Sequence, residues 1–209
     1  FLIDEPIAAA LGAGMDISES TGNMVVDIGG GTTEIGIMSL NGIVYADSVR
    51  VAGDSFNESI TKYVRQEHQV IIGEVTAEKI KEEVGSAYKS SANKKAKYVG
   101  RGLTSGLPTE FIMTNTQTRK ALKEPLIAII GAIRVALEQT PPELSSDIAE
   151  SGVMLTGGGA LLEGLSDLIK TKTNLDVRIA DNPLICVAHG ASMALEMINN
   201  QQMAFVSAE

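Results

Sequence analysis

Three consecutive glycines follow an aspartate in the segment VVDIGGGTTEIGI, which opens at Val25. Glycine amides carry no side chain, so a loop of this kind can bring its N–H groups close to phosphate oxygens. Asp27 is a suitable ligand for Mg²⁺, which proteins usually hold through one or two carboxylates together with phosphate. The residues of this candidate phosphate loop are Gly29, Gly30, Gly31 and Thr32. A β bulge or tight hairpin without a ligand explains the glycines equally well from the spacing alone.

The loop matches neither of two common nucleotide-binding fingerprints. Glu34 stands where a dinucleotide-binding turn would need its third glycine. No Gly-Lys-Ser or Gly-Lys-Thr follows the glycines, so the loop is not a P-loop. A phosphate site here would therefore be a strand–turn–strand loop with two hydroxyls and a carboxylate at its edges.

A second glycine triplet occurs in MLTGGGALLEGL, between a predicted strand and a predicted helix start. Amides at the start of a helix can face an anionic ligand, although close backbone packing at such a turn also selects glycine. The residues concerned are Gly157, Gly158 and Gly159. Two glycine loops in one chain strengthen the ligand hypothesis for both, because a nucleotide has two ends to hold.

Two further groups carry charges that could reach a ligand. Glu78, Lys81 and Glu82 fall at positions i, i+3 and i+4 of a predicted helix, so they share one face beside its apolar stripe. Such a face could contact a ribose or base, but a solvated surface with an ion pair is more common. Glu5, next to Pro6, could position an attacking water, but the helix dipole also favours a carboxylate there. From spacing alone we favour the structural interpretation for both groups.

Composition limits the functional classes. The chain has 209 residues, of which 44% are hydrophobic, so it can bury a proper core. Its net charge of −9 argues against a nucleic-acid partner, because Lys and Arg bind phosphate backbones. One cysteine and two histidines exclude a disulfide framework and disfavour zinc, which fits a reducing cytosolic compartment.

The start of the sequence suggests a piece of a longer protein, and its apolar runs predict no membrane-spanning helix within these residues. No apolar run reaches the roughly eighteen residues that a spanning helix needs. The chain opens at Phe1 within an apolar run, so we expect it to be the C-terminal part of a longer protein.

Periodicity and turn signals predict the elements that would position these residues. A β meander is expected over 23–52, with Asn41-Gly42 as its hairpin turn. Thr76 is expected to cap a helix, and Pro125 to split or kink another. The expected helices span 7–15, 53–67, 76–88, 116–139, 143–151, 160–173 and 186–198, with further strands at 97–103, 108–114, 152–159 and 175–180. This order predicts an α/β fold with a mixed sheet flanked by helices, interrupted by an insert at about 53–115.

Six segments together resemble the MreB family of bacterial actins. They are FLIDEPIAAALGAG, MVVDIGGGTTEIGIMSLNGIV, GEVTAEKIKEEVGSAY, GRGLTSGLP, LEQTPPELSSDI and MLTGGGALLEGL. DIGGGTT and TGGGA recur across the superfamily of actins, sugar kinases and heat-shock chaperones. AEKIKEEVGSAY and QTPPELSSDI make the chain resemble the MreB family in particular, and the resemblance covers nearly the whole chain.

The resemblance implies an actin-like ATPase fold, which is a ribonuclease H-like mixed sheet flanked by helices with a smaller α+β subdomain inserted. Residues 1–23 would be the end of domain I and the interdomain helix. Residues 24–52 and 116–209 would form subdomain IIA, and residues 53–115 the inserted subdomain IIB. The chain would be the C-terminal half of such a protein.

The resemblance also implies ATP or ADP with Mg²⁺ as cofactors. It makes Asp27 and Gly29–Thr32 the second phosphate loop, with Asp27 directed toward Mg²⁺ through a water. Gly157–Gly159 and Ala160 would form the adenosine motif.

Roles for the remaining candidates follow from the same resemblance and reverse the structural interpretation above. Glu78, Lys81 and Glu82 would border the ribose and adenine, while Glu5 and Asp27 would order the hydrolytic water. The family's first phosphate loop, an Asp-Leu-Gly-Thr segment, is absent from this sequence. We therefore expect slow ATP hydrolysis in a full-length protein and weak or no hydrolysis by this chain alone.

The implied function is that of a cytoskeletal protein, which polymerises into filaments and organises cell-wall synthesis and rod shape. Its implied partners are further copies of itself, a transmembrane adaptor such as RodZ, cell-wall elongation proteins, and the inner membrane surface through the first half. It would be cytoplasmic and peripheral at the inner face of the bacterial membrane. A non-polymerising actin-fold ATPase or adaptor, such as an FtsA-like division protein or a chaperone ATPase domain, remains the alternative.

Overall fold

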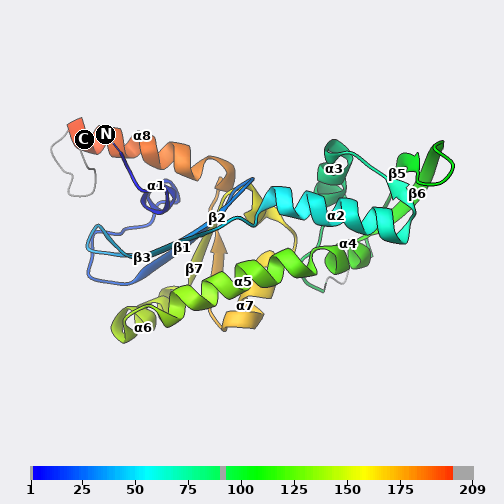
Figure 1. Cartoon of the computed structure of the whole chain (residues 1–209). Coiled ribbons are helices and arrows are strands. Elements are labelled where there is room, and N and C mark those ends of the chain that lie inside the picture. The colour runs from blue at the N-terminus through cyan, green and yellow to red at the C-terminus, as the bar shows by residue number, and fades with distance from the viewer. Residues whose placement is uncertain (1, 90–92, 200–209) are drawn as a thin grey trace.

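The computed structural model describes residues 2–89 and 93–199, and its larger part is built on a mixed five-stranded sheet (Figure 1). The strand order is β3-β2-β1-β7-β8. Central β1 runs antiparallel to β2 and parallel to β7, and β7 runs parallel to β8. The bounds are β1 Asn23–Ile28, β2 Thr33–Ser39, β3 Gly42–Val49, β7 Val153–Thr156 and β8 Val177–Ile179. The mixed sheet and the β meander predicted from the sequence are confirmed.

Helices cover both faces of this sheet, as Figure 1 shows. Helices α1 (Glu5–Gly12) and α8 (Cys186–Asn199) lie on one face. Helices α5 (Lys123–Glu138), α6 (Pro142–Ser151) and α7 (Leu165–Thr173) lie on the other. Successive side chains of β1 point to opposite faces of the sheet. Met24, Val26 and Ile28 therefore lie in the larger hydrophobic core, whereas Val25 packs with residues of α1. Asp27 therefore shares the α1 face with Val25.

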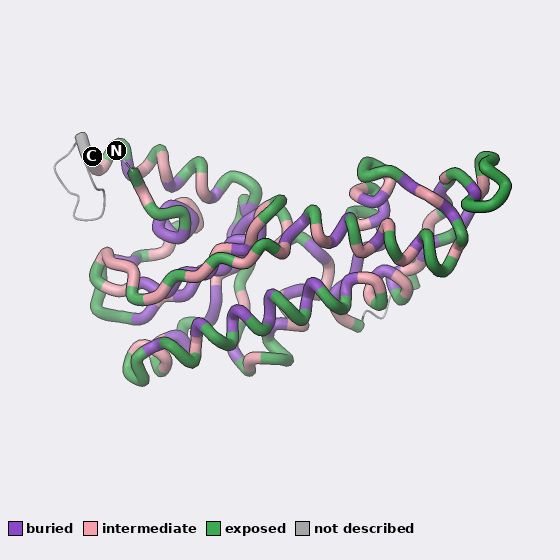
Figure 2. The backbone as a smooth tube through the Cα atoms, in the orientation of Figure 1, coloured by how far each residue is buried: buried purple, intermediate pink, exposed green. Residues whose placement is uncertain are grey.

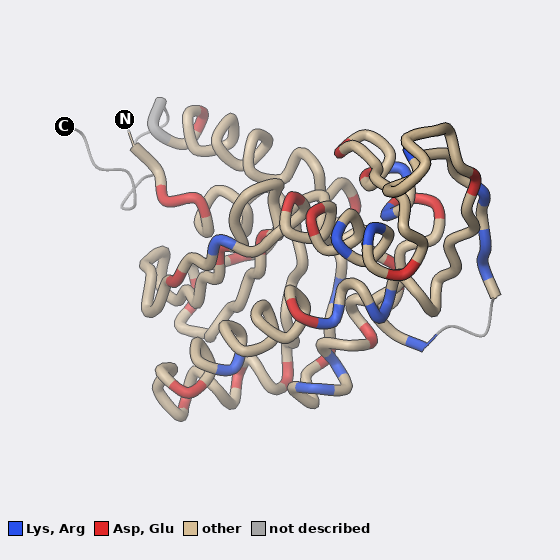
Figure 3. The backbone as a smooth tube through the Cα atoms, turned by 45° about the vertical axis from the view of Figure 1, so that its right-hand side comes forward, with Lys and Arg blue, Asp and Glu red and all other residues tan. Residues whose placement is uncertain are grey.

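A second, three-stranded sheet forms the other part of the molecule, with strand order β4-β5-β6. Its strands are β4 Val70–Ile71, β5 Lys95–Gly102 and β6 Pro108–Thr114, and the helices around it are α2 Gly53–Glu67, α3 Glu74–Val84 and α4 Asn115–Ala121. Buried residues continue from the large sheet along α2 and α5 into this part (Figure 2). Lys and Arg are concentrated around the smaller sheet, whereas Asp and Glu are spread over both parts (Figure 3).

Helix α3 differs from the predicted helix at both ends. It begins at Glu74 with Gly73 as its N-cap, so the prediction that Thr76 caps it is wrong. The amide of Thr76 donates to the carbonyl of Gly73, which places Thr76 inside the first turn. The helix ends at Val84 because Gly85 turns to an extended conformation against Leu162.

The helix predicted at 116–139 is two helices, but the break lies at Leu122 and not at Pro125. Helix α4 begins after Thr114, which forms a capping box with Gln117. Pro125 falls in the first turn of α5, where its missing N–H costs no intrahelical hydrogen bond.

The helix predicted at 160–173 is also shorter than expected. Residues Gly158–Leu161 form a 3₁₀ turn, η1, and α7 begins only at Leu165. Gly164 separates them with a left-handed backbone at φ 74°. Strand β4 has two residues, Val70 and Ile71, too few for a periodic signal, and it was not predicted.

Candidate functional site

The first glycine triplet is a turn between β1 and β2 that is anchored to the start of α2. The Gly29 amide donates to the Thr32 carbonyl at 3.0 Å, which closes the turn. The amides of Gly53 and Asp54 donate to the carbonyls of Gly29 and Gly30, at 3.1 and 2.8 Å. These contacts hold the loop against the N-terminus of α2, whose partial positive charge favours an anion nearby.

The second glycine triplet packs directly on the end of β1. Gly157 has a φ of 78°, and a Cβ there would lie 2.3 Å from the carbonyl oxygen of Ile28. A Cβ at Gly159 would lie 2.2 Å from Cγ2 of the same Ile28. The Gly157 amide also donates to the Pro183 carbonyl at 2.8 Å. Only glycines permit this approach, which brings the two triplets together although they are far apart in the sequence.

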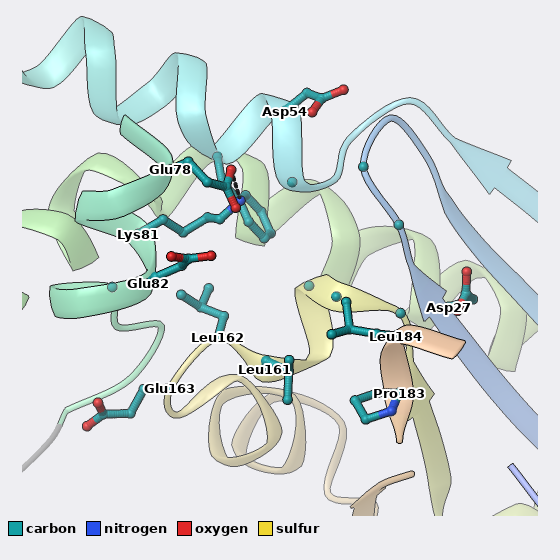
Figure 4. A pocket seen from close by; sticks show the side chains of 18 of the residues that line it. Asp27, Asp54, Glu78, Lys81, Glu82, Leu161, Leu162, Glu163, Pro183 and Leu184 are labelled. Atoms are coloured by element: carbon teal, nitrogen blue, oxygen red, sulfur yellow. Dashed lines mark hydrogen bonds and ion pairs between the residues drawn. The ribbon is translucent and has the colours of Figure 1, made fainter. Parts of the chain in front are cut away.

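A single cavity of about 710 Å³ opens between these loops, α3 and η1 (Figure 4). It is lined by nine of the predicted site residues, namely Asp27, Gly29, Gly30, Glu78, Lys81, Glu82, Gly157, Gly158 and Gly159. Four predicted residues do not line it, namely Glu5, Gly31, Thr32 and Ala160. Gly31 and Thr32 belong to the same turn as Gly29, whereas Ala160 is the fully buried residue of η1.

Asp27 is the buried charge of the site, with 4% of its surface exposed. Thr156 on the neighbouring parallel strand β7 donates from Oγ1 to Oδ1 of Asp27 at 2.6 Å. Burial raises the pKa of Asp27, the Thr156 hydrogen bond opposes that rise, and the nearby Glu34 charge adds to it. A cation or a hydrogen-bond donor in the cavity would relieve the cost of this partly compensated charge.

Glu5 lies outside the cavity lining, in the first turn of α1, where its side chain is exposed. Partial burial raises the pKa of Glu5, and the charges of Glu34 and Asp27 raise it further. Glu34 pairs with Asp27 across β1 and β2, so these carboxylates share the α1 face of the sheet. The structure thus brings Glu5 near Asp27 without placing it in the cavity.

Helix α3 supplies a hydrogen-bonded group of polar side chains to the cavity. Lys81 donates from Nζ to Oε2 of Glu78 at 2.8 Å, and Asn57 of α2 donates from Nδ2 to the same oxygen at 2.5 Å. Burial favours a higher pKa for Glu78, but these two hydrogen bonds outweigh it and hold the pKa below its ordinary value. Glu82 lines the cavity one turn after Glu78.

Sequence reasoning missed four apolar side chains that line the cavity. It also missed the ion pair between Lys94 and Glu163, which lines the cavity as well. Leu161 and Leu162 follow the second triplet, and Pro183 and Leu184 precede α8, all lining the cavity. Leu184 is 71% exposed, and it lines the cavity together with these other apolar side chains. Asp54 could have been inferred from its place at a helix start, whereas the leucines carry no distinguishing local pattern.

Replacing Lys81 with methionine tests whether this cluster works as a unit. The variant Lys81→Met should raise the pKa of Glu78, because it removes a hydrogen bond and a positive charge while leaving burial in place. In the wild type, ionised Glu78 stabilises the folded state above its unfolded-state pKa, and this stabilisation is lost as the pH falls through the pKa of Glu78 in the folded state. Because the folded-state pKa is higher in the variant, the variant should lose this stabilisation at a higher pH than the wild type. NMR titration of the Glu78 carboxyl checks this result, and an unchanged pKa would contradict it.

Comparison with known proteins identifies the family. Residues 1–203 match the family described as MreB/Mbl protein. This chain belongs to the MreB/Mbl family. It is 54% identical over 199 residues to the cell shape-determining protein MreB of Escherichia coli (strain K12), covering 95% of this chain and 57% of that protein. It is 43% identical over 196 residues to the cell shape-determining protein Mbl of Bacillus subtilis (strain 168), covering 94% of this chain and 59% of that protein.

Solved structures show that this MreB/Mbl chain has the actin-like fold. A crystal structure of MreB5 of Spiroplasma citri bound to AMPPNP superposes with a TM-score of 0.92 at 36% identity, covering 95% of this chain and 60% of that one. The MamK double helical filament has a TM-score of 0.76 at 23% identity over 92% of this chain and 58% of that one, which supports the fold alone. The predicted family resemblance and fold class are confirmed. The chain spans about 57–60% of the length of these MreB/Mbl relatives.

Proposed function

We propose that this chain forms one wall of an ATP site in a filament-forming cytoskeletal protein that determines cell shape. The observation that carries the proposal is the meeting of two glycine triplets at Ile28, beside buried Asp27, in one cavity. The size of that cavity, about 710 Å³, falls within the range of small-molecule sites. MreB5 of Spiroplasma citri was solved with AMPPNP and with ADP, which supports an adenine nucleotide as the ligand.

In this proposal the cavity has a phosphate end and a base end. Gly29, Gly30 and Gly157–Gly159 offer backbone that a phosphate can approach closely, next to the α2 N-terminus. The apolar surfaces of Leu161 and Leu184 suit the face of a purine. Glu78, Lys81 and Glu82 on α3 would border the ribose and adenine, and Gly31, Thr32 and Ala160 would support the two loops from behind.

The residues at the phosphate end fit Mg²⁺ that is held mainly by phosphate and water. Among the described residues, no group of three or more His, Cys, Asp or Glu side chains could hold a metal ion alone. Asp27 is a buried carboxylate that lines the cavity and accepts a hydrogen bond from Thr156 at Oδ1, which suits contact with Mg²⁺ through a water. Mg²⁺ would neutralise phosphate charge when bound, while Asp27 and Glu5 would orient the attacking water.

The wider role rests on family membership. The relatives are named cell shape-determining proteins, which supports the proposed role in cell shape. We propose that residues 53–115 act as subdomain IIB on a IIA body, and that the full-length protein lies at the inner membrane face. There it would meet a transmembrane adaptor such as RodZ and cell-wall elongation proteins. In residues 2–89 and 93–199, no helix is both long and apolar enough to cross a membrane.

Nucleotide-dependent stabilisation and sedimentation of the full-length protein test the proposed function. Saturating ATP with Mg²⁺ should raise the unfolding temperature, because a ligand that binds only the folded state stabilises it by about 2.7 kcal/mol at a hundredfold excess over Kd. ATP should also drive the protein into the pellet as filaments visible by electron microscopy. Binding without pelleting at high protein concentration would leave a non-polymerising actin-fold ATPase as the function, and no binding would overturn the nucleotide site.

A further inference from the structure

One ion pair bridges the two parts of the molecule at the edge of the cavity. Lys94, just before β5, places Nζ 2.5 Å from Oε2 of Glu163, which lies between η1 and α7. Both residues line the cavity, although they are separated by 69 positions in the sequence. Figure 4 shows Glu163 and Asp27 on opposite sides of the cavity. The ion pair therefore stands at the end away from the glycine triplets, beside Leu161 and Leu162.

Backbone contacts join residues 85–88, which follow α3, to the same segment that carries Glu163. The amide of Ala87 donates to the carbonyl of Glu163 at 2.8 Å. Gly164 lies against Tyr88, where a Cβ would come within 3.0 Å of Tyr88 Cβ. Residues 85–88 after α3 thus pack on residues 162–164, and the Lys94–Glu163 ion pair adds a second connection to this segment, from the start of β5. Separation of the two segments would open the base end of the cavity.

We propose that the Lys94–Glu163 ion pair is a clasp that slows nucleotide release from the base end of the site. The inference rests on the proposed function, because it needs a nucleotide in this cavity. Lys94 and Glu163 are positioning residues here. They hold α3 and the residues after it against the η1 segment, and so keep the two walls around the base together.

The expected acceleration of nucleotide release follows from the solvent exposure of the two side chains in the ion pair. The side chains of Lys94 and Glu163 are 46% and 35% exposed, so water and salt screen their attraction. Removing either charge should speed release about two- to fivefold, the range that a partly exposed ion pair supports. High salt should bring the wild-type rate toward that of the variants.

Release of radiolabelled ADP, chased with excess unlabelled ADP in the presence of Mg²⁺, measures this effect in the full-length protein. Lys94→Gln and Glu163→Gln should each accelerate release with little change in association rate or unfolding temperature. The double variant Lys94→Glu/Glu163→Lys should restore slow, salt-sensitive release. Lys97→Gln is the matched control, because Lys97 pairs with Glu110 at 2.6 Å on the β5–β6 ribbon outside the cavity lining.

The outcomes separate this inference from the proposed function. Wild-type-like release from both single variants, or the same acceleration in Lys97→Gln, would overturn the clasp while leaving the nucleotide site intact. Fast release from the charge-swapped double variant would also overturn it, because the pair would then not act through its mutual attraction. Failure of the wild-type protein to bind ADP at all would overturn the proposed function, and the clasp with it.

Discussion

Replacing Gly157 with alanine is expected to abolish nucleotide binding and to lower the free energy of unfolding. The new Cβ would lie 2.3 Å from the carbonyl oxygen of Ile28, a distance that real Cβ atoms do not adopt. The φ of 78° adds strain of roughly 1–3 kcal/mol for a residue with a side chain. Relief of the clash must push the second triplet away from β1, so the phosphate end loses its shape. Differential scanning calorimetry with and without ATP and Mg²⁺ measures both effects.

Gly106→Ala is the matched control for this variant. Gly106 has nearly the same backbone, with a φ of 69°, but no heavy atom lies within 4 Å of the position of its Cβ. It sits in the turn between β5 and β6, outside the cavity lining. We expect a loss of about 1 kcal/mol from the left-handed backbone alone, with a normal response to nucleotide. A Gly157→Ala protein that still responds to ATP would show that the second triplet is only a packing feature.

Replacing Asp27 with asparagine should have opposite effects on the free and the nucleotide-bound protein. The free protein should gain roughly 1–3 kcal/mol at neutral pH, because the variant removes a buried and partly compensated charge. Thr156 can still donate its hydroxyl to the amide oxygen of the new side chain. Affinity for ATP with Mg²⁺ should fall about tenfold or more, because the charge that would hold the metal-bound water is lost. Urea unfolding and equilibrium binding measure the two effects.

The pH dependence of the Asp27→Asn effect has a defined sign. Burial raises the pKa of Asp27 in the folded state, so its contribution to stability is fully present below the ordinary value of 3.8 and lost as the pH rises through the folded pKa. The advantage of the variant should therefore shrink in acid. Asp16→Asn is a contrasting control, because hydrogen bonds from Ser18 lower the pKa of exposed Asp16 and give the opposite sign. A stability difference between Asp27→Asn and wild type that is constant with pH would contradict this account.

Local signals in the sequence determined several parts of this protein. The Asn41-Gly42 signal predicted the hairpin between β2 and β3, but the position of the turn was wrong by one residue. Its two turn residues are Leu40 and Asn41, with left-handed φ values of 52° and 61°, and Gly42 pairs with Ser39 as the first residue of β3. Helix α2 follows from apolar residues at helical spacing that reach the core. Asp27 and most of the glycines could be chosen as site candidates from the sequence. An aspartate and consecutive glycines form an unusual pattern directly beside an apolar strand.

Only the tertiary structure decided which of these residues meet. The two glycine triplets come together because β1 pairs in parallel with β7, and no local pattern specifies that partner. Leu184 and the Lys94–Glu163 pair reach the cavity from segments with no distinctive sequence. The N-cap at Gly73 and the break at Leu122 differ from the predictions because packing and capping contacts outweigh propensities of a few tenths of a kcal/mol. The conformational preferences of neighbouring residues determine which helices and strands form. The cavity depends on contacts between residues that are far apart in the chain.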